Sequence, residues 1–177
     1  MHSAGEGRVA DRKMIYYRVS SIERKPVNHI LETEMELAVA LDTVFAFFSQ
    51  AENLARITPP ELQFQITTPT PIEIREGTLI NYRMSLFGVS FGWETKITRY
   101  EAPHIFIDEQ IRGPYAVWVH THTFEERGSV TCIRDQVRYR LPFYPLGEVV
   151  HPLVRMQLER IFAYRKQAVR AALEAQR

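Results

Sequence analysis

The chain has 177 residues, of which 45% are hydrophobic and 24% charged, and its formal net charge is +1. This length and composition predict one globular domain that is large enough to bury a core. Lysines and arginines are scattered among nearly as many carboxylates, so no basic block is present that would bind a phosphate backbone. We therefore expect no nucleic-acid partner.

The single cysteine, Cys132, excludes an internal disulfide and a metal site built from several cysteines, and it fits a reducing compartment. The segment from Met1 to Lys13 lacks the apolar core of a signal peptide. No later stretch is long and apolar enough to cross a bilayer. These features predict a cytoplasmic protein with no stable membrane insertion.

Residues 1–27 are interpreted as an N-terminal extension that is partly flexible, and residues 28–177 as the folded domain. From Ile30 to Ala38, apolar residues alternate with glutamates, which predicts a strand with one wet face. Asp42 stands where the N-cap of a short helix belongs, and a second short helix is predicted from Glu52 to Ile57.

The pattern then changes to strands separated by turn residues. The predicted strands are Leu62–Thr67, Leu79–Phe87, Val89–Tyr100, Ile105–Arg112, Tyr115–Glu125 and Val130–Leu141. Short turns at Phe87-Gly88, Glu101–Pro103, Gly113-Pro114 and Arg127-Gly128 suit an antiparallel meander. From Gly147 to Arg177 apolar residues recur at helical spacing, which predicts a long helix with one apolar face. This order predicts an α+β helix-grip fold, in which a curved antiparallel sheet wraps around the long C-terminal helix, with two short helices after the first strand.

The run from Phe106 to Phe124, which includes Gly113-Pro114-Tyr115 and Trp118-Val119-His120-Thr121-His122, resembles a signature of bacterial SRPBCC-domain proteins. Further matches are Asp135, Val137 and Tyr139, then Leu141-Pro142-Phe143 and the run Ile161–Arg165. The likeness spans most of the chain, from Ile30 to Leu173. It implies the START/Bet v 1-like fold of the polyketide cyclase/dehydrase-like proteins. Related scaffolds bind lipids, quinones or hormones, or cyclise polyketides, so the resemblance does not select a reaction.

A two-residue turn at Gly113-Pro114 determines which side chains of the meander face the presumed pocket. This register places Asp108 on the solvent face. The predicted ligand-binding residues are Tyr82, Met84, Trp93, Glu109, Trp118, His120, His122, Phe124 and Tyr139.

Polar side chains are the most informative members of this set. The predicted register puts His120 directly opposite Asp135, with Glu109 diagonal to His120. An imidazole held by a carboxylate suits general acid/base chemistry on a carbonyl or hydroxyl ligand. In the alternative interpretation, which we favour because any pocket needs polar anchors, the three residues satisfy one another and position the polar end of a ligand.

The alternation of His120 and His122 near two carboxylates is similar to a two-His-one-carboxylate metal set, but two histidines one residue apart are a weak signal. We therefore expect neither a metal nor a cofactor.

The leading hypothesis is a protein that binds a small apolar molecule, lipid-, quinone- or aromatic polyketide-like, between the sheet and the last helix. The alternative is an enzyme of the cyclase/dehydratase or hydrolase type that uses His120 with Asp135 or Glu109. A third hypothesis is an interaction protein that docks through basic residues of the last helix, which are Arg155, Arg160, Arg165, Lys166 and Arg170. The sequence selects no oligomeric state.

Overall fold

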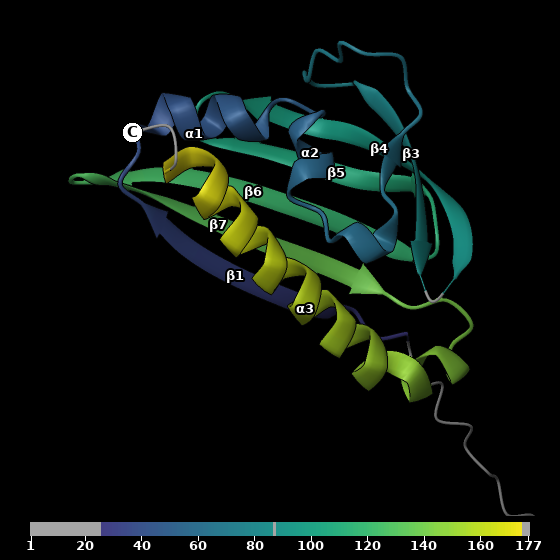
Figure 1. The fold of residues 1–177 in the computed structure, drawn as a ribbon. Coiled ribbons are helices and arrows are strands. Elements are labelled where there is room, and N and C mark those ends of the chain that lie inside the picture. The colour runs from purple at the N-terminus through teal and green to yellow at the C-terminus, as the bar shows by residue number, and fades with distance from the viewer. Residues whose placement is uncertain (1–25, 87, 175–177) are drawn as a thin grey trace, which may run out of the picture.

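Seven strands form one antiparallel sheet in the computed structural model, which describes residues 26–86 and 88–174 (Figure 1). The order across the sheet is β1-β7-β6-β5-β4-β3-β2. The strands are β1 (His29–Leu37), β2 (Gln65–Ile66), β3 (Leu79–Leu86), β4 (Val89–Glu101), β5 (Ile105–Arg112), β6 (Val117–Arg127) and β7 (Val130–Arg140). The helices are α1 (Leu41–Phe48), α2 (Asn53–Arg56) and α3 (Leu146–Glu174), with a single 3₁₀ turn over Pro60–Leu62.

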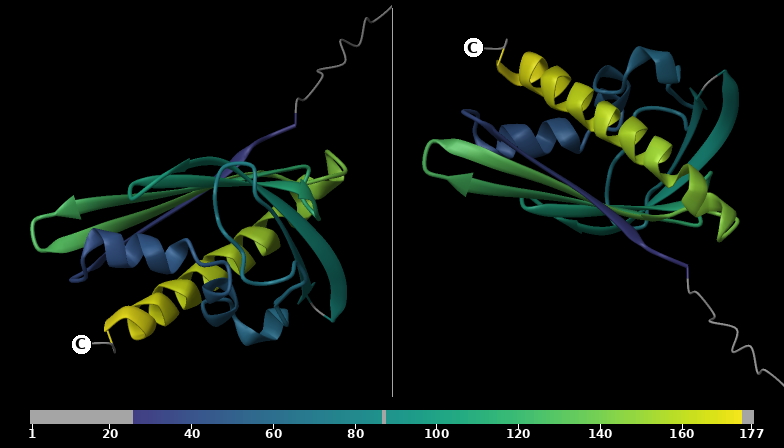
Figure 2. Two further views of the ribbon diagram at one scale, coloured as in Figure 1. Left: turned by 90° about the horizontal axis from the view of Figure 1, so that it is seen from above. Right: turned by 90° about the horizontal axis from the view of Figure 1, so that it is seen from below.

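The long helix α3 runs along the concave side of the sheet, and α1 and α2 lie on the same side (Figure 2). Its residues Leu158, Phe162, Val169 and Leu173 are buried, and their spacings of four and seven residues put them on one helical face. Removing this apolar stripe from water is what fixes the helix on the sheet. The arrangement confirms the predicted helix-grip fold.

Helix α1 begins at Leu41, so its N-cap is Ala40 and not Asp42, which lies in the first turn. The prediction of Asp42 as the cap was wrong by two residues, and no side chain caps this helix. The carboxylate of Asp42 still lies where it complements the positive end of the helix dipole.

Three groups of buried side chains make up the core. The first joins the aromatic residues of α1 to β5, β6 and the end of α3, and contains Phe45, Phe48, Phe106, Phe124 and Val169 among others. The second joins β1 and β7 to the middle of α3, and contains Leu31, Val137, Tyr139, Leu141, Leu158 and Phe162. The third lies under β3, at Ala51, Ile80 and Tyr82.

Among the described residues, strand β1 forms one edge of the sheet and pairs with β7 alone. Its alternate residues Glu32, Glu34 and Glu36 are the exposed positions that the sequence pattern predicted. Arg134 Nε donates to Glu34 at 2.6 Å, and Gln136 donates to Glu32 at 2.7 Å. On the solvent-exposed face of β1, polar side-chain contacts therefore link this strand to β7.

A bulge in β4 changes which side chains of β4 face inward. Ile97 pairs with Asp108 whereas Arg99 pairs with Ile107, so Thr98 is an extra residue in β4. Before the bulge Ile97 lines the cavity, and beyond it Tyr100 packs against the core. Strand β5 keeps its even-numbered residues Phe106 and Asp108 on the concave side along the whole pairing.

The connection between β5 and β6 is also longer than predicted. Strand pairing ends at Glu109 and Val119, so Gly113-Pro114 is not a two-residue hairpin turn. Asp108 pairs with His120, so the predicted face of β5 was wrong because it depended on that turn. The side chain of Gln110 holds this connection, because it donates to the Tyr115 carbonyl at 2.7 Å and accepts from the Tyr115 amide at 3.3 Å.

Strands β6 and β7 are joined at Gly128-Ser129, where Arg127 pairs with Val130. Gly128 has φ +62, a conformation that favours glycine. His122 is therefore opposite Asp135, and His120 is opposite Val137. The predicted register was off by two residues, which leaves both histidines on the predicted face because side chains alternate with a period of two.

Within the part of the chain that the structure describes, no helix is both long and apolar enough to cross a membrane. The predicted extension, residues 1–27, lies outside the described residues except for its last two positions. The domain boundary at Asn28 stays a prediction.

Candidate functional site

A cavity of about 440 Å³ lies between the sheet and α3. Its size falls within the range of small-molecule sites, roughly 300–1,000 Å³. Apolar and aromatic side chains make up most of its wall. They include Leu54, Ile74, Ile80, Tyr82, Met84, Phe91, Trp93, Trp118, Val154 and Ile161.

Six of the predicted ligand-binding residues line this cavity, namely Tyr82, Met84, Trp93, Trp118, His120 and His122. The indole rings of Trp93 and Trp118 meet edge to face with centroids 5.1 Å apart. Burial and the charge of Asp108 raise the pKa of Tyr82, so its hydroxyl stays protonated and can donate to a ligand.

Phe124 and Tyr139 lie on the concave face as predicted, but neither is among the cavity-lining residues. Phe124 packs in the core against Phe45 and Phe48, at ring-centroid distances of 5.3 and 5.2 Å. The hydroxyl of Tyr139 is 3.0 Å from His151 Nε2. Both side chains are thus occupied by protein contacts.

Glu109 is the predicted site residue that the structure places elsewhere. Its carboxylate accepts a hydrogen bond from Thr98 Oγ1 at 3.0 Å, and the side chain is not part of the cavity wall. The longer connection between β5 and β6 exchanges Glu109 for its neighbour Asp108, which was predicted to face solvent and which pairs with His120. The expected diagonal contact between Glu109 and His120 is therefore replaced by a contact to Asp108.

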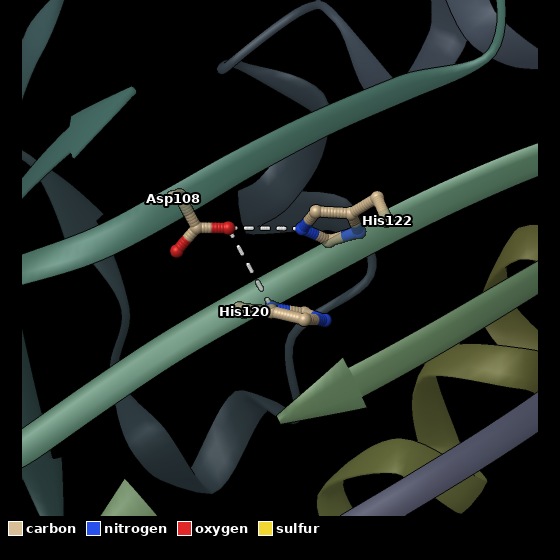
Figure 3. Close-up of side chains that lie close together, drawn as sticks. All are labelled: Asp108, His120 and His122. Atoms are coloured by element: carbon tan, nitrogen blue, oxygen red, sulfur yellow. Dashed lines mark hydrogen bonds and ion pairs between the residues drawn. The ribbon is translucent and has the colours of Figure 1, made fainter. Parts of the chain in front are cut away.

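Asp108, His120, His122 and Asp135 form a cluster of alternating acids and bases on β5, β6 and β7. Asp108 Oδ2 lies 2.9 Å from His122 Nε2 and 3.6 Å from His120 Nδ1 (Figure 3). Asp135 Oδ1 lies 2.9 Å from His120 Nε2 and 2.8 Å from His122 Nδ1. The last contact lacks hydrogen-bond geometry, so its contribution is electrostatic. We call these four residues the His–Asp cluster.

The two imidazoles differ in proton affinity although they are neighbours. Burial lowers the pKa of His120, and the charge of His122 lowers it further. Burial also opposes the protonation of His122, but its hydrogen bond with Asp108 and the nearby negative charge of Asp135 outweigh burial and raise the pKa. The cluster therefore favours a charged His122 beside a neutral His120.

Both carboxylates of the cluster stay ionised. Burial works to raise the pKa of Asp135, but its hydrogen bond with His120 and the nearby imidazole of His122 hold the pKa well below its ordinary value. The pKa of Asp108 is also lowered, because the contact with His122 outweighs burial. The charge of Arg165 on α3 contributes to both shifts.

Three members of the cluster offer a set of metal donors. One atom each of Asp108, His120 and His122 lies within 4.8 Å of the others, and Asp135 contacts the second nitrogen of each imidazole. This is the composition of a two-His-one-carboxylate site with an outer carboxylate. Without an ion, Nε2 of each imidazole hydrogen-bonds to a carboxylate, whereas Nδ1 of His122 is buried with an electrostatic contact alone.

Arg165 is a cavity residue that the sequence interpretation missed, because it was assigned to a solvent-facing basic stripe. It lies three residues after Phe162 and four before Val169, which is the spacing of the buried stripe. That spacing was a signal available in the sequence. The predicted row of basic residues on α3 is interrupted, because Arg155, Arg160 and Arg170 form ion pairs with Glu159, Glu61 and Glu174, respectively.

Known proteins share this architecture. The model of a family described as "Polyketide cyclase / dehydrase and lipid transport" matches residues 37–170. A search of curated protein sequences gives no match.

Several solved structures are similar to the chain. A point mutant of norcoclaurine synthase from Thalictrum flavum, in complex with a transition-state analogue, is 15% identical with a TM-score of 0.64, over 87% of this chain and 99% of that one. The di-domain ARO/CYC StfQ of the steffimycin biosynthetic pathway is 11% identical with a TM-score of 0.64, over 84% of this chain and 51% of that one. The protein Ms6760 from Mycobacterium smegmatis is 18% identical with a TM-score of 0.62, over 84% and 92%. At these identities the likeness shows the fold alone.

Proposed function

Because the chain belongs to the polyketide cyclase/dehydrase and lipid transport family, we propose that it binds a small hydrophobic molecule, lipid-, quinone- or aromatic polyketide-like, in the cavity between the sheet and α3. The observation that carries the proposal is the cavity of about 440 Å³ with a largely apolar wall and a few convergent polar groups. This combination is typical of sites that bury most of a small ligand. The proposed location is the cytoplasm, where such a carrier would act on soluble or membrane-derived ligands.

Native mass spectrometry of the protein purified from its own host tests the proposal. A stoichiometric apolar molecule that is released on denaturation is the expected result. A cavity-filling variant, Met84→Trp, should lose this molecule, because Met84 lines the cavity and an indole would occupy part of it. Ile30→Trp, at an exposed position outside the cavity, is the matched control. Retention of the molecule by Met84→Trp would contradict the proposal that the molecule binds in this cavity.

A second candidate function is proton-transfer catalysis by His120. Its Nε2 lies 2.9 Å from Asp135 Oδ1, and an ionised carboxylate can only accept, so the proton of neutral His120 is on Nε2. Nδ1 is then free to take a proton from a carbonyl- or hydroxyl-bearing ligand in the cavity. Glu109 is assigned neither ligand binding nor proton transfer, because its side chain contacts Thr98 and is not part of the cavity wall.

The variant His120→Gln separates the two functions. A carrier keeps most of its affinity, whereas an enzyme loses turnover while binding is retained. Incubation of the co-purified molecule with wild-type and variant protein, followed by mass spectrometry of the products, gives the readout. Equal conversion by both proteins would exclude His120 as the acid/base.

A further inference from the structure

Arg165 is the one charged side chain of α3 that lines the cavity. The residues around it on this helical face, Leu158, Phe162 and Val169, are buried and apolar. Arg165 is half-buried among them, and withdrawing part of a charged guanidinium from water is unfavourable unless the charge has a partner.

Two aromatic side chains pack against this guanidinium. Its Cζ lies 5.5 Å from the centroid of Phe48 and 5.9 Å from that of Phe162. Contacts with aromatic faces attract a cation without using its N–H groups. Nε is buried and has no hydrogen-bond partner, and across residues 26–86 and 88–174 no carboxylate oxygen lies within 4.0 Å of Arg165.

The two carboxylates of the His–Asp cluster, of which Asp108 lines the cavity, are already engaged. Asp108 accepts from His122 and Asp135 accepts from His120, each at 2.9 Å. The charge of Arg165 acts on both carboxylates at longer range, but their oxygens are directed to the imidazoles. The donors of Arg165 are therefore available to a molecule that enters the cavity.

We propose that Arg165 binds the acidic group of the ligand, so that the cavity takes an amphiphilic carboxylic acid in its ionised form. This inference rests on the proposed function and names the class of ligand within it. A guanidinium presents parallel N–H groups that match the two oxygens of a carboxylate. The acid group would lie at α3, beside the His–Asp cluster, and the apolar body would extend along Trp93 and Met84.

Calorimetric titration with two probes of equal chain length, decanoate and 1-decanol, tests the proposal at pH 7.5. Wild-type protein is expected to bind the acid roughly tenfold or more tightly than the alcohol, since a hydrogen bond to a charged group in a buried site is stronger than a neutral one. Equal affinities in the wild type would overturn the inference. This comparison needs no variant, so a substitution that impairs folding does not remove the test.

Variants assign the preference to the side chain. Arg165→Gln should lose the preference for decanoate while its affinity for 1-decanol is kept, and Arg165→Lys should retain part of it because the charge remains. Arg155→Gln is the matched control, because Arg155 is exposed on the same helix and pairs with Glu159. A preference that survives in Arg165→Gln would overturn the assignment. If neither probe binds, this inference fails, whereas the proposed function is decided separately by native mass spectrometry.

Discussion

Asp108 on β5 and His122 on β6 are joined through Oδ2 and Nε2 at 2.9 Å, and this contact gives His122 its high proton affinity. Removing the negative charge should therefore lower the pKa of His122. We expect Asp108→Asn to have this effect in an NMR titration of the imidazole. Glu109→Gln is the matched control, because the neighbouring carboxylate faces Thr98. An unchanged titration of His122 in Asp108→Asn would contradict the geometry of the cluster.

The stability of the protein should depend on pH through His122. Its pKa is raised on folding, so its contribution is fully present below the pKa of the unfolded chain, about 6.5, and is lost as pH rises through the folded value. Above pH 6.5 the free energy of unfolding should fall, with a limiting slope of about 1.4 kcal/mol per pH unit for one proton. Urea unfolding at several pH values measures this. His122→Gln should flatten the profile in this window, and a wild-type profile that rises there would contradict the prediction.

Phe124 should act in the core and not in ligand binding. It is 2% exposed and packs against Phe45, Phe48 and Phe106. Phe124→Ala is expected to lower the free energy of unfolding by about 3–5 kcal/mol. Phe143→Ala, at an 83% exposed position, should change it by less than about 0.5 kcal/mol. Denaturant titration compares the two, and a small effect of Phe124→Ala would place this ring outside the core.

The His–Asp cluster should be stable without a metal ion, because each imidazole nitrogen already lies near a carboxylate oxygen. Dialysis against a chelator should therefore leave the melting temperature unchanged. Elemental analysis of protein purified without chelator provides the second readout. One equivalent of zinc or iron, together with a lower melting temperature after its removal, would show that Asp108, His120 and His122 are ligands.

The fold was predictable because its signals are local and repeated. Alternating glutamates marked β1, and an apolar stripe of helical period marked α3, so both elements were identified to within a few residues at most. Short turns between the strands gave the order of the meander. These patterns arise because each strand or helix of this fold buries one face against the core and exposes the other.

The site was less predictable because the connection between β5 and β6 decides it. The assumed two-residue turn at Gly113-Pro114 turned Glu109 inward and Asp108 outward, whereas the actual pairing puts Asp108 opposite His120. The parity of a strand cannot be carried across an unrecognised bulge or a loop of unknown length. His120 and His122 were placed on the correct face because an error of two residues in register preserves parity.

The charged edge of the sheet has a consequence for contacts between molecules. If two copies of β1 were to align antiparallel about Glu34, Glu32 of one copy would meet Glu36 of the other, and the two Glu34 side chains would meet each other. Like charges in direct opposition disfavour continuation of the sheet from one molecule into the next. The glutamates that made β1 recognisable as a strand therefore also protect its open edge against strand-to-strand aggregation, and replacing all three by glutamine should make light scattering rise with protein concentration.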